Sequence, residues 1–217
     1  MTSSSASHTG SPAAVTPTIT SEQVPHSPAF RHLSTIAGIG IDLRYATPDN
    51  FVGRDLYSPL DCAWLHTEAA AAIERVVAWL ALRRPECKLV ILDALRPHRV
   101  QEQLWDALAD TGLRMYLADP VRGSIHSYGM AVDVTILDGA GQELDMGTGF
   151  DDMTELSHPA LEKEMLAAGR LSAAQAANRQ LLRDAMFQAG FVGINSEWWH
   201  FDCGDRAAVR ATYTRVL

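Results

Sequence analysis

The sequence predicts one α+β domain, with helices packed around a small, mostly antiparallel sheet. Two observations favour this class. The chain has 217 residues, which is enough for one hydrophobic core and too few to require two domains. Helical apolar stripes and short apolar runs follow one another without a regular βαβ pattern and without an internal repeat.

The start of the chain differs in composition from the rest. Residues 1–28 are rich in Ser, Thr, Ala and Pro, and we expect them to form a flexible leader that contributes little to the fold. The domain is then predicted at 29–217. The leader lacks the basic start and continuous apolar run of a signal peptide, which favours a cytoplasmic location, with the periplasm as the alternative.

The overall charge limits the partners. A formal net charge of -8 and a pI near 5.4 argue against nucleic acid or an anionic membrane surface. No apolar run approaches the roughly 18–20 residues that span a bilayer. Three isolated cysteines form no CxxC pair, so neither a disulfide framework nor a cysteine zinc cluster is indicated. Nothing in the sequence indicates an oligomeric state.

The first predicted elements are a strand, a turn and a short helical piece. Apolar residues alternate over 39–43, which is typical of a strand, and the polar residues at 47–50 mark a turn. Ser58-Pro59 is predicted to start a helical turn, because proline is tolerated at the first helical position.

The strongest patterns predict a helix followed by a central strand. Ile73, Val76 and Leu80 repeat at helical spacing, so we expect a helix over about 66–84 that Pro85 ends. The short, almost wholly apolar run at 88–93 then reads as a strand covered on both faces.

Two further helices have clear starts. Pro97 opens one whose apolar residues face inward, and Ser172 with Gln175 forms a capping box for another over 173–189. The remaining expectations are a connection at 111–123, a strand at 130–137, a turn at 138–141, a helical piece at 159–168, extended segments at 191–194 and 198–202, and a terminal helix at 206–215.

Two stretches contain the residues that could bind a metal or take part in catalysis. Residues 124–133 contain His126 and Asp133, and Glu-Trp-Trp-His at 197–200 adds Glu197 and His200. Two imidazoles and a carboxylate, with an open position and a second carboxylate nearby, are the parts of a catalytic zinc site. The other six histidines have no partner at a suggestive spacing and are interpreted as structural.

Each candidate residue also has an interpretation that involves no metal. Asp133 interrupts an apolar strand, where a carboxylate is costly to bury unless it is paired. It could instead be exposed on a polar face with Ala131 and Thr135. Glu197 and His200 are three residues apart and would point to opposite faces of an ideal strand, so a shared site requires the backbone to bulge or turn between them.

Several ordered motifs together resemble the zinc D-alanyl-D-alanine dipeptidases of the vancomycin-resistance type, in peptidase family M15, which share a fold with D,D-carboxypeptidases and the hedgehog domain. The resemblance covers roughly 37–203. Its motifs are Ser124-x-His126-x-x-Gly129-x-Ala131-x-Asp133, Glu197-Trp-Trp-His200, Asp42-Leu-Arg-Tyr45-Ala-Thr-x-x-Asn50-Phe51-x-Gly53, Asp93-x-x-Arg96-Pro97 and Met146-Gly147-x-x-Phe150-Asp151-x-Met153.

The resemblance implies a role for each site residue. His126, Asp133 and His200 would bind one zinc ion. Glu197 would act as general base toward a zinc-activated water, and Arg96 would stabilise the oxyanion of the tetrahedral intermediate.

The resemblance also implies a small zwitterionic dipeptide as the substrate. Tyr45 and Asp151 would lie near its ammonium group, and Ser124 would offer a hydrogen bond beside the metal. The loops depart from the family at Ile125, Tyr128 and Asp152, which affects the substrate range more than the zinc chemistry.

The leading hypothesis is therefore a zinc-dependent D-Ala-D-Ala dipeptidase. A D,D-carboxypeptidase acting on peptidoglycan stem peptides is the alternative with the same chemistry. A non-catalytic, hedgehog-like zinc-binding domain is the alternative from another class, and the presence of Glu197 and Arg96 argues against it. Antibiotic resistance, dipeptide catabolism and wall turnover are all consistent with the sequence.

Overall fold

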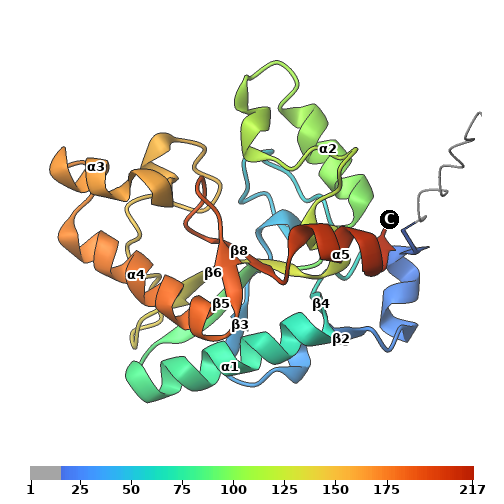
Figure 1. The fold of residues 1–217 in the computed structure, drawn as a ribbon, viewed down its shortest axis with the longest axis horizontal. Coiled ribbons are helices and arrows are strands. Elements are labelled where there is room, and N and C mark those ends of the chain that lie inside the picture. The colour runs from blue at the N-terminus through green and yellow to red at the C-terminus, as the bar shows by residue number, and fades with distance from the viewer. Residues whose placement is uncertain (1–15) are drawn as a thin grey trace, which may run out of the picture.

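A five-stranded mixed sheet lies at the centre of the computed structural model, which describes residues 16–217 (Figure 1). The strand order is β3-β5-β6-β8-β7, in which β3 and β5 are parallel and the other neighbours are antiparallel. The expected α+β class with a mostly antiparallel sheet is confirmed. The strands are β3 (Ile39–Ile41), β5 (Lys88–Asp93), β6 (Ala131–Leu137), β7 (Phe191–Gly193) and β8 (His200–Cys203).

The two central strands form the middle of the core. All of β5 except Lys88 is buried, and all of β6 except Leu137 is buried. A register shift between Ile91 and Asp93 places Asp93 directly opposite Asp133. Two carboxylates are therefore paired at one end of a largely apolar pair of strands.

Two long helices cover the sheet and pack against each other (Figure 1). Helix α1 (Thr67–Arg83) buries an apolar stripe that includes Ile73, Val76 and Leu80. Helix α4 (Ala173–Gln188) begins at the predicted capping box of Ser172 and Gln175. Both helices lie within about one residue of their predicted bounds, because caps and helical periodicity are local signals.

The shorter helices surround the sheet ends. They are α2 (His98–Ala107), α3 (Glu162–Ala167) and α5 (Arg206–Thr212), with short 3-10 turns between them. No helix in the described part of the chain is long and apolar enough to cross a membrane.

The chain between residues 16 and 28 differs from the expected leader. Residues 1–15 lie outside the described range. From there on, β1 (Thr18–Ile19) pairs with β9 (Arg215–Val216), and Val24 is fully buried. Pairing with a strand almost two hundred residues away leaves no signal in local composition, so the sequence did not indicate it.

Two other local expectations were wrong. Ser58-Pro59 lies in a turn and does not start a helix, because the Asp55 side chain accepts hydrogen bonds from the backbone amides of Tyr57 and Ser58, each at 2.9 Å. The terminal helix predicted for 206–215 ends at Thr212, because the residues after it form β9. One small antiparallel pair, β2 (Phe30–His32) with β4 (Trp64–His66), was not predicted at all.

Candidate metal and active site

The three predicted ligands come from neighbouring parts of the sheet. Asp133 in β6 is the register partner of His200, the first residue of β8. His126 lies in a 3-10 turn (Ile125–Tyr128) that leads into β6. Gly129 ends this turn with φ 64, and a Cβ there would lie 2.7 Å from the amide nitrogen of His66, so only glycine fits.

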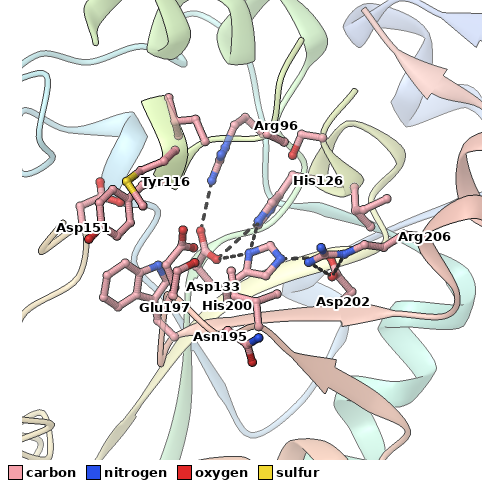
Figure 2. Close-up of a pocket in the computed structure, with 18 of the residues that line it drawn as sticks. Arg96, Tyr116, His126, Asp133, Asp151, Asn195, Glu197, His200, Asp202 and Arg206 are labelled. Carbon is pink, nitrogen blue, oxygen red and sulfur yellow. Dashed lines mark hydrogen bonds and ion pairs between the residues drawn. The ribbon is translucent and has the colours of Figure 1, made fainter. Parts of the chain in front are cut away.

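The candidate ligand atoms form a small triangle (Figure 2). Nε2 of His126 lies 3.1 Å from Nδ1 of His200, and Oδ1 of Asp133 lies 3.4 Å and 3.0 Å from these two atoms. Zinc with ligands at about 2.0–2.1 Å in a tetrahedron would separate them by about 3.3 Å. This is the single group of potential metal ligands found within the described residues 16–217.

The outer contacts of the ligands orient them toward one another. The other ring nitrogen of His126 faces the carbonyl oxygen of Ala94 at 2.9 Å, and that of His200 faces Oδ1 of Asp202 at 3.0 Å. Each of these nitrogens therefore donates outward, and the nitrogen facing the triangle presents a lone pair. Three electron-pair donors with nothing to accept them fit a divalent cation. The residues present therefore suit the zinc ion that the family resemblance implies.

Asp133 is buried, so the exposed alternative is wrong. It is 2% exposed, and Ala131 and Thr135 are fully buried as well. The pKa of Asp133 lies well below its usual range, since the nearby histidines outweigh the burial that would raise it. Its Oδ2 accepts a hydrogen bond from Nη2 of Arg96 at 3.1 Å.

Arg96 is held rigidly at the wall of the site. The residue is 6% exposed, its Nε donates to Asp93 at 2.8 Å, and its Nη1 donates to Gln101 at 3.1 Å. The guanidinium also lies 4.9 Å from the ring centroid of Tyr45. This arrangement fixes an always-charged donor beside the three candidate ligands.

Glu197 lies in the irregular segment between β7 and β8. The backbone bends at residues 195–196 and 198–199, and β8 begins only at His200, which is the departure from an ideal strand that the spacing required. Figure 2 shows Glu197 beside Asp133 on the side of Asp151. Burial raises the pKa of Glu197 to about 7, against the lowering effect of the nearby His200.

A second polar group lies farther along the same wall. The hydroxyl of Tyr45 donates to Oδ1 of Asp151 at 3.1 Å, and Oδ2 of Asp151 is buried with no hydrogen-bond partner among the described residues. Asp151 has φ 59, a left-handed conformation that is uncommon outside glycine. Burial and then the charge of Asp133 raise the pKa of Asp151 well above its usual value.

One cavity of about 330 Å³ connects these groups. All of the residues singled out from the sequence line it: Tyr45, Arg96, Ser124, His126, Asp133, Asp151, Glu197 and His200. Four further charged residues line the cavity and were not predicted from the sequence: Asp202, Arg122, Arg206 and Arg210. Asp202 had a usable signal, because residues two apart on a strand share a face and Asp202 follows His200 by two.

Comparison with known proteins shows the family to which the chain belongs. The family model for peptidase M15, described as D-ala-D-ala dipeptidase, matches residues 29–217. A D-alanyl-D-alanine dipeptidase of Escherichia coli (strain K12) is 41% identical over 168 residues, which cover 77% of this chain and 80% of the relative. Relatives with the same name from Streptomyces coelicolor and Enterococcus faecium are 31% and 29% identical, and each match covers 76% of this chain and 86% of the relative.

A solved structure of the LdcB LD-carboxypeptidase is also similar, with 15% identity, a TM-score of 0.46, and coverage of 84% of this chain and 71% of that one. The family assignment depends on the sequence matches alone. Because the family model spans residues 29–217 and the Escherichia coli relative is 41% identical, the chain belongs to the D-alanyl-D-alanine dipeptidase family of peptidases.

Proposed function

We propose that this enzyme is a zinc-dependent dipeptidase that hydrolyses D-alanyl-D-alanine. The observation that supports this most is the convergence of His126, Asp133 and His200 in the cavity that Glu197 and Arg96 also line. The family relatives are named for this activity.

His126, Asp133 and His200 would hold the zinc ion through the atoms that face one another. A bound zinc ion supplies a Lewis acid that polarises a carbonyl and lowers the pKa of a coordinated water to about 7. The outward contacts to Ala94 and Asp202 keep both imidazoles in the tautomer and orientation that this requires.

Glu197 is the proposed general base. A pKa of about 7 leaves the carboxylate basic enough to take a proton and the acid strong enough to return it at neutral pH. Glu197 would take the proton from the attacking water and deliver it to the nitrogen of the leaving D-alanine. Both transfers fit one side chain that lies beside the ligand triangle.

Arg96 is the proposed oxyanion donor. Its Nε and Nη2 bind Asp93 and Asp133, whereas Nη1 contacts Gln101 alone among the described residues. A guanidinium has five N–H groups in a fixed plane, so one N–H of Nη1 is left for the carbonyl oxygen as it becomes charged. Because Arg96 is held in place before the substrate arrives, little reorganisation is needed during the reaction.

Asp151 and Tyr45 are the proposed recognition groups for the substrate ammonium. A buried carboxyl with an unpartnered oxygen is costly in the empty pocket, and an ammonium group would satisfy it. Blocking the substrate nitrogen with an acyl group would remove that charge and add bulk. The same pair would therefore discriminate against longer peptides.

A substrate panel tests this proposal. The zinc-loaded enzyme is expected to cleave D-Ala-D-Ala, and to be at least about a hundredfold slower on N-acetyl-D-Ala-D-Ala and on a muramyl pentapeptide, because a buried carboxylate would lose its charged partner. Efficient release of the terminal D-alanine from the pentapeptide with no cleavage of the dipeptide would contradict the proposal and indicate a D,D-carboxypeptidase.

A further inference from the structure

The two ends of the cavity carry opposite charge. Asp151 and Glu197 lie on one side of the ligand triangle, and Figure 2 shows Asp202 and Arg206 on the other side. Arg122 and Arg210 line the same cavity. The proposed function uses the acidic end and the centre, and it assigns no role to these three arginines.

Arg206 is already compensated by a carboxylate. Its Nε and Nη2 both lie 2.5 Å from Oδ2 of Asp202, whose other oxygen contacts His200. The charge of Arg206 is thus largely used in orienting the ligand histidine. It is the weakest candidate of the three for binding a substrate group.

Arg210 is placed differently. It is half-buried in the last turn of α5, and its Nε donates to the carbonyl oxygen of Gly123 at 3.0 Å, which holds the guanidinium next to Ser124. Nη1 makes a long contact of 3.5 Å with the carbonyl of Arg206. Across the described residues, Nη2 has no hydrogen-bond partner and the side chain has no carboxylate within 4.0 Å. Nη2 of Arg210 therefore remains available to a ligand in the cavity that this residue lines.

Arg122 adds a second uncompensated charge. It is exposed, and within the described range its guanidinium makes no hydrogen bond or ion pair. Burial, followed by the charges of Arg122 and Arg206, lowers the pKa of Arg210. Arg210 still stays charged at neutral pH, so the neighbouring cations repel one another until an anion enters.

We propose that Arg210, assisted by Arg122, binds the C-terminal carboxylate of the substrate. This inference rests on the proposed function and names the groups that recognise the second charged end of the dipeptide. The ammonium would lie toward Asp151, the carboxylate toward Arg210, and the peptide bond over the ligand triangle between them. A guanidinium suits this task because it binds a carboxylate through two parallel N–H groups.

Binding measured without turnover tests this inference. The zinc-loaded Glu197→Gln protein is titrated calorimetrically with D-Ala-D-Ala and with its C-terminal amide, which keeps the ammonium and removes the carboxylate charge. The acid is expected to bind about ten- to a hundredfold more tightly than the amide, as for a hydrogen-bonded charged group. Adding Arg210→Gln should remove most of that difference by weakening the acid and leaving the amide unchanged.

Matched variants separate binding from folding. Arg210→Lys should restore part of the preference for the acid. Arg122→Gln, at an exposed position whose side chain has no hydrogen bond or ion pair among the described residues, should reduce that preference with the thermal midpoint unchanged. Arg170→Gln removes an equally exposed charge outside the cavity and should change neither affinity. In turnover with Glu197 intact, Arg210→Gln should raise KM for D-Ala-D-Ala much more than it lowers kcat.

The inference would be overturned if the ratio of the affinities for the acid and the amide were the same in Arg210→Gln and Arg122→Gln as in the parent. Failure of the proposed function would look different. In that case the parent zinc protein would hydrolyse no dipeptide, while a ratio that still depended on Arg210 would support carboxylate binding at this end of the cavity.

Discussion

Nε2 of His200 lies 3.0 Å from Oδ1 of Asp202, and this contact turns Nδ1 of the same ring toward Asp133. The carboxylate is 3% exposed, so its interaction with the ring is only weakly screened by water. Asp202 does not face the centre of the ligand triangle. It determines which nitrogen of His200 presents a lone pair there.

Replacement of Asp202 by Ala is expected to lower zinc affinity about 10–100-fold, the usual effect of losing an outer partner of a metal-binding histidine. Competition with a chromophoric chelator measures this. Asp184→Ala, an exposed aspartate on α4, is the matched control and should bind zinc like the parent. Unchanged affinity in Asp202→Ala would show that the contact does not orient the ring.

Glu197→Gln should reduce kcat by about 10²–10⁴, because glutamine keeps the shape of the side chain and loses the proton acceptor. Zinc content, measured by elemental analysis, should stay at the parent level, since Glu197 is not one of the three candidate ligands. Parent-like hydrolysis by this variant would mean that another group takes the proton.

The pH dependence of kcat/KM should have an acid limb governed by Glu197. Burial raises its pKa to about 7, so the neutral acid predominates below that pH and the base is lost as the pH falls. A bound cation favours the carboxylate, which places the limb at or below about pH 7. The limb should be absent from the residual activity of Glu197→Gln. Activity that still rises steeply above about pH 8 would assign the base to a different group.

Arg96→Lys should lower kcat/KM by about 10²–10³, the range found when an oxyanion donor is removed. Lysine keeps the charge but cannot bind Asp93, Gln101 and Asp133 together, so the thermal midpoint should fall as well. Arg99→Lys, at an exposed position in the first turn of α2, tests whether any Arg-to-Lys change near this helix has the same effect. Equal activity of the two variants would remove Arg96 from the mechanism.

The parts of the fold that were predictable depend on local signals. The strand at Lys88–Asp93 has the predicted bounds because an apolar run follows a helix that a proline ends. The capping box at Ser172 is also a local signal, and α4 begins where this signal predicted. By contrast, β1 and β9 are two residues long and exist only because they pair with each other, so neither had a pattern of its own.

The site residues also divide into those with a local sequence signal and those placed by contacts between distant segments. A carboxylate in an apolar strand and a Glu-x-x-His spacing indicated Asp133, Glu197 and His200 from the chain alone. The resemblance to known motifs added Arg96, Tyr45 and Asp151. Arg122 and Arg210 were not predictable, because an arginine in a loop or a terminal helix usually contacts solvent, and their position in the cavity depends on how α5 packs against the turn around His126.

Hydrolysis of D-Ala-D-Ala before and after removal of the metal tests directly whether the protein is a zinc-dependent dipeptidase. The purified protein should release free D-alanine, lose that activity on dialysis against a chelator, and regain it with one equivalent of zinc. His126→Ala, His200→Ala and Asp133→Ala should each fail to regain it. Full activity in the chelated protein, or the absence of dipeptide cleavage by the zinc-loaded protein, would contradict zinc-dependent hydrolysis of the dipeptide.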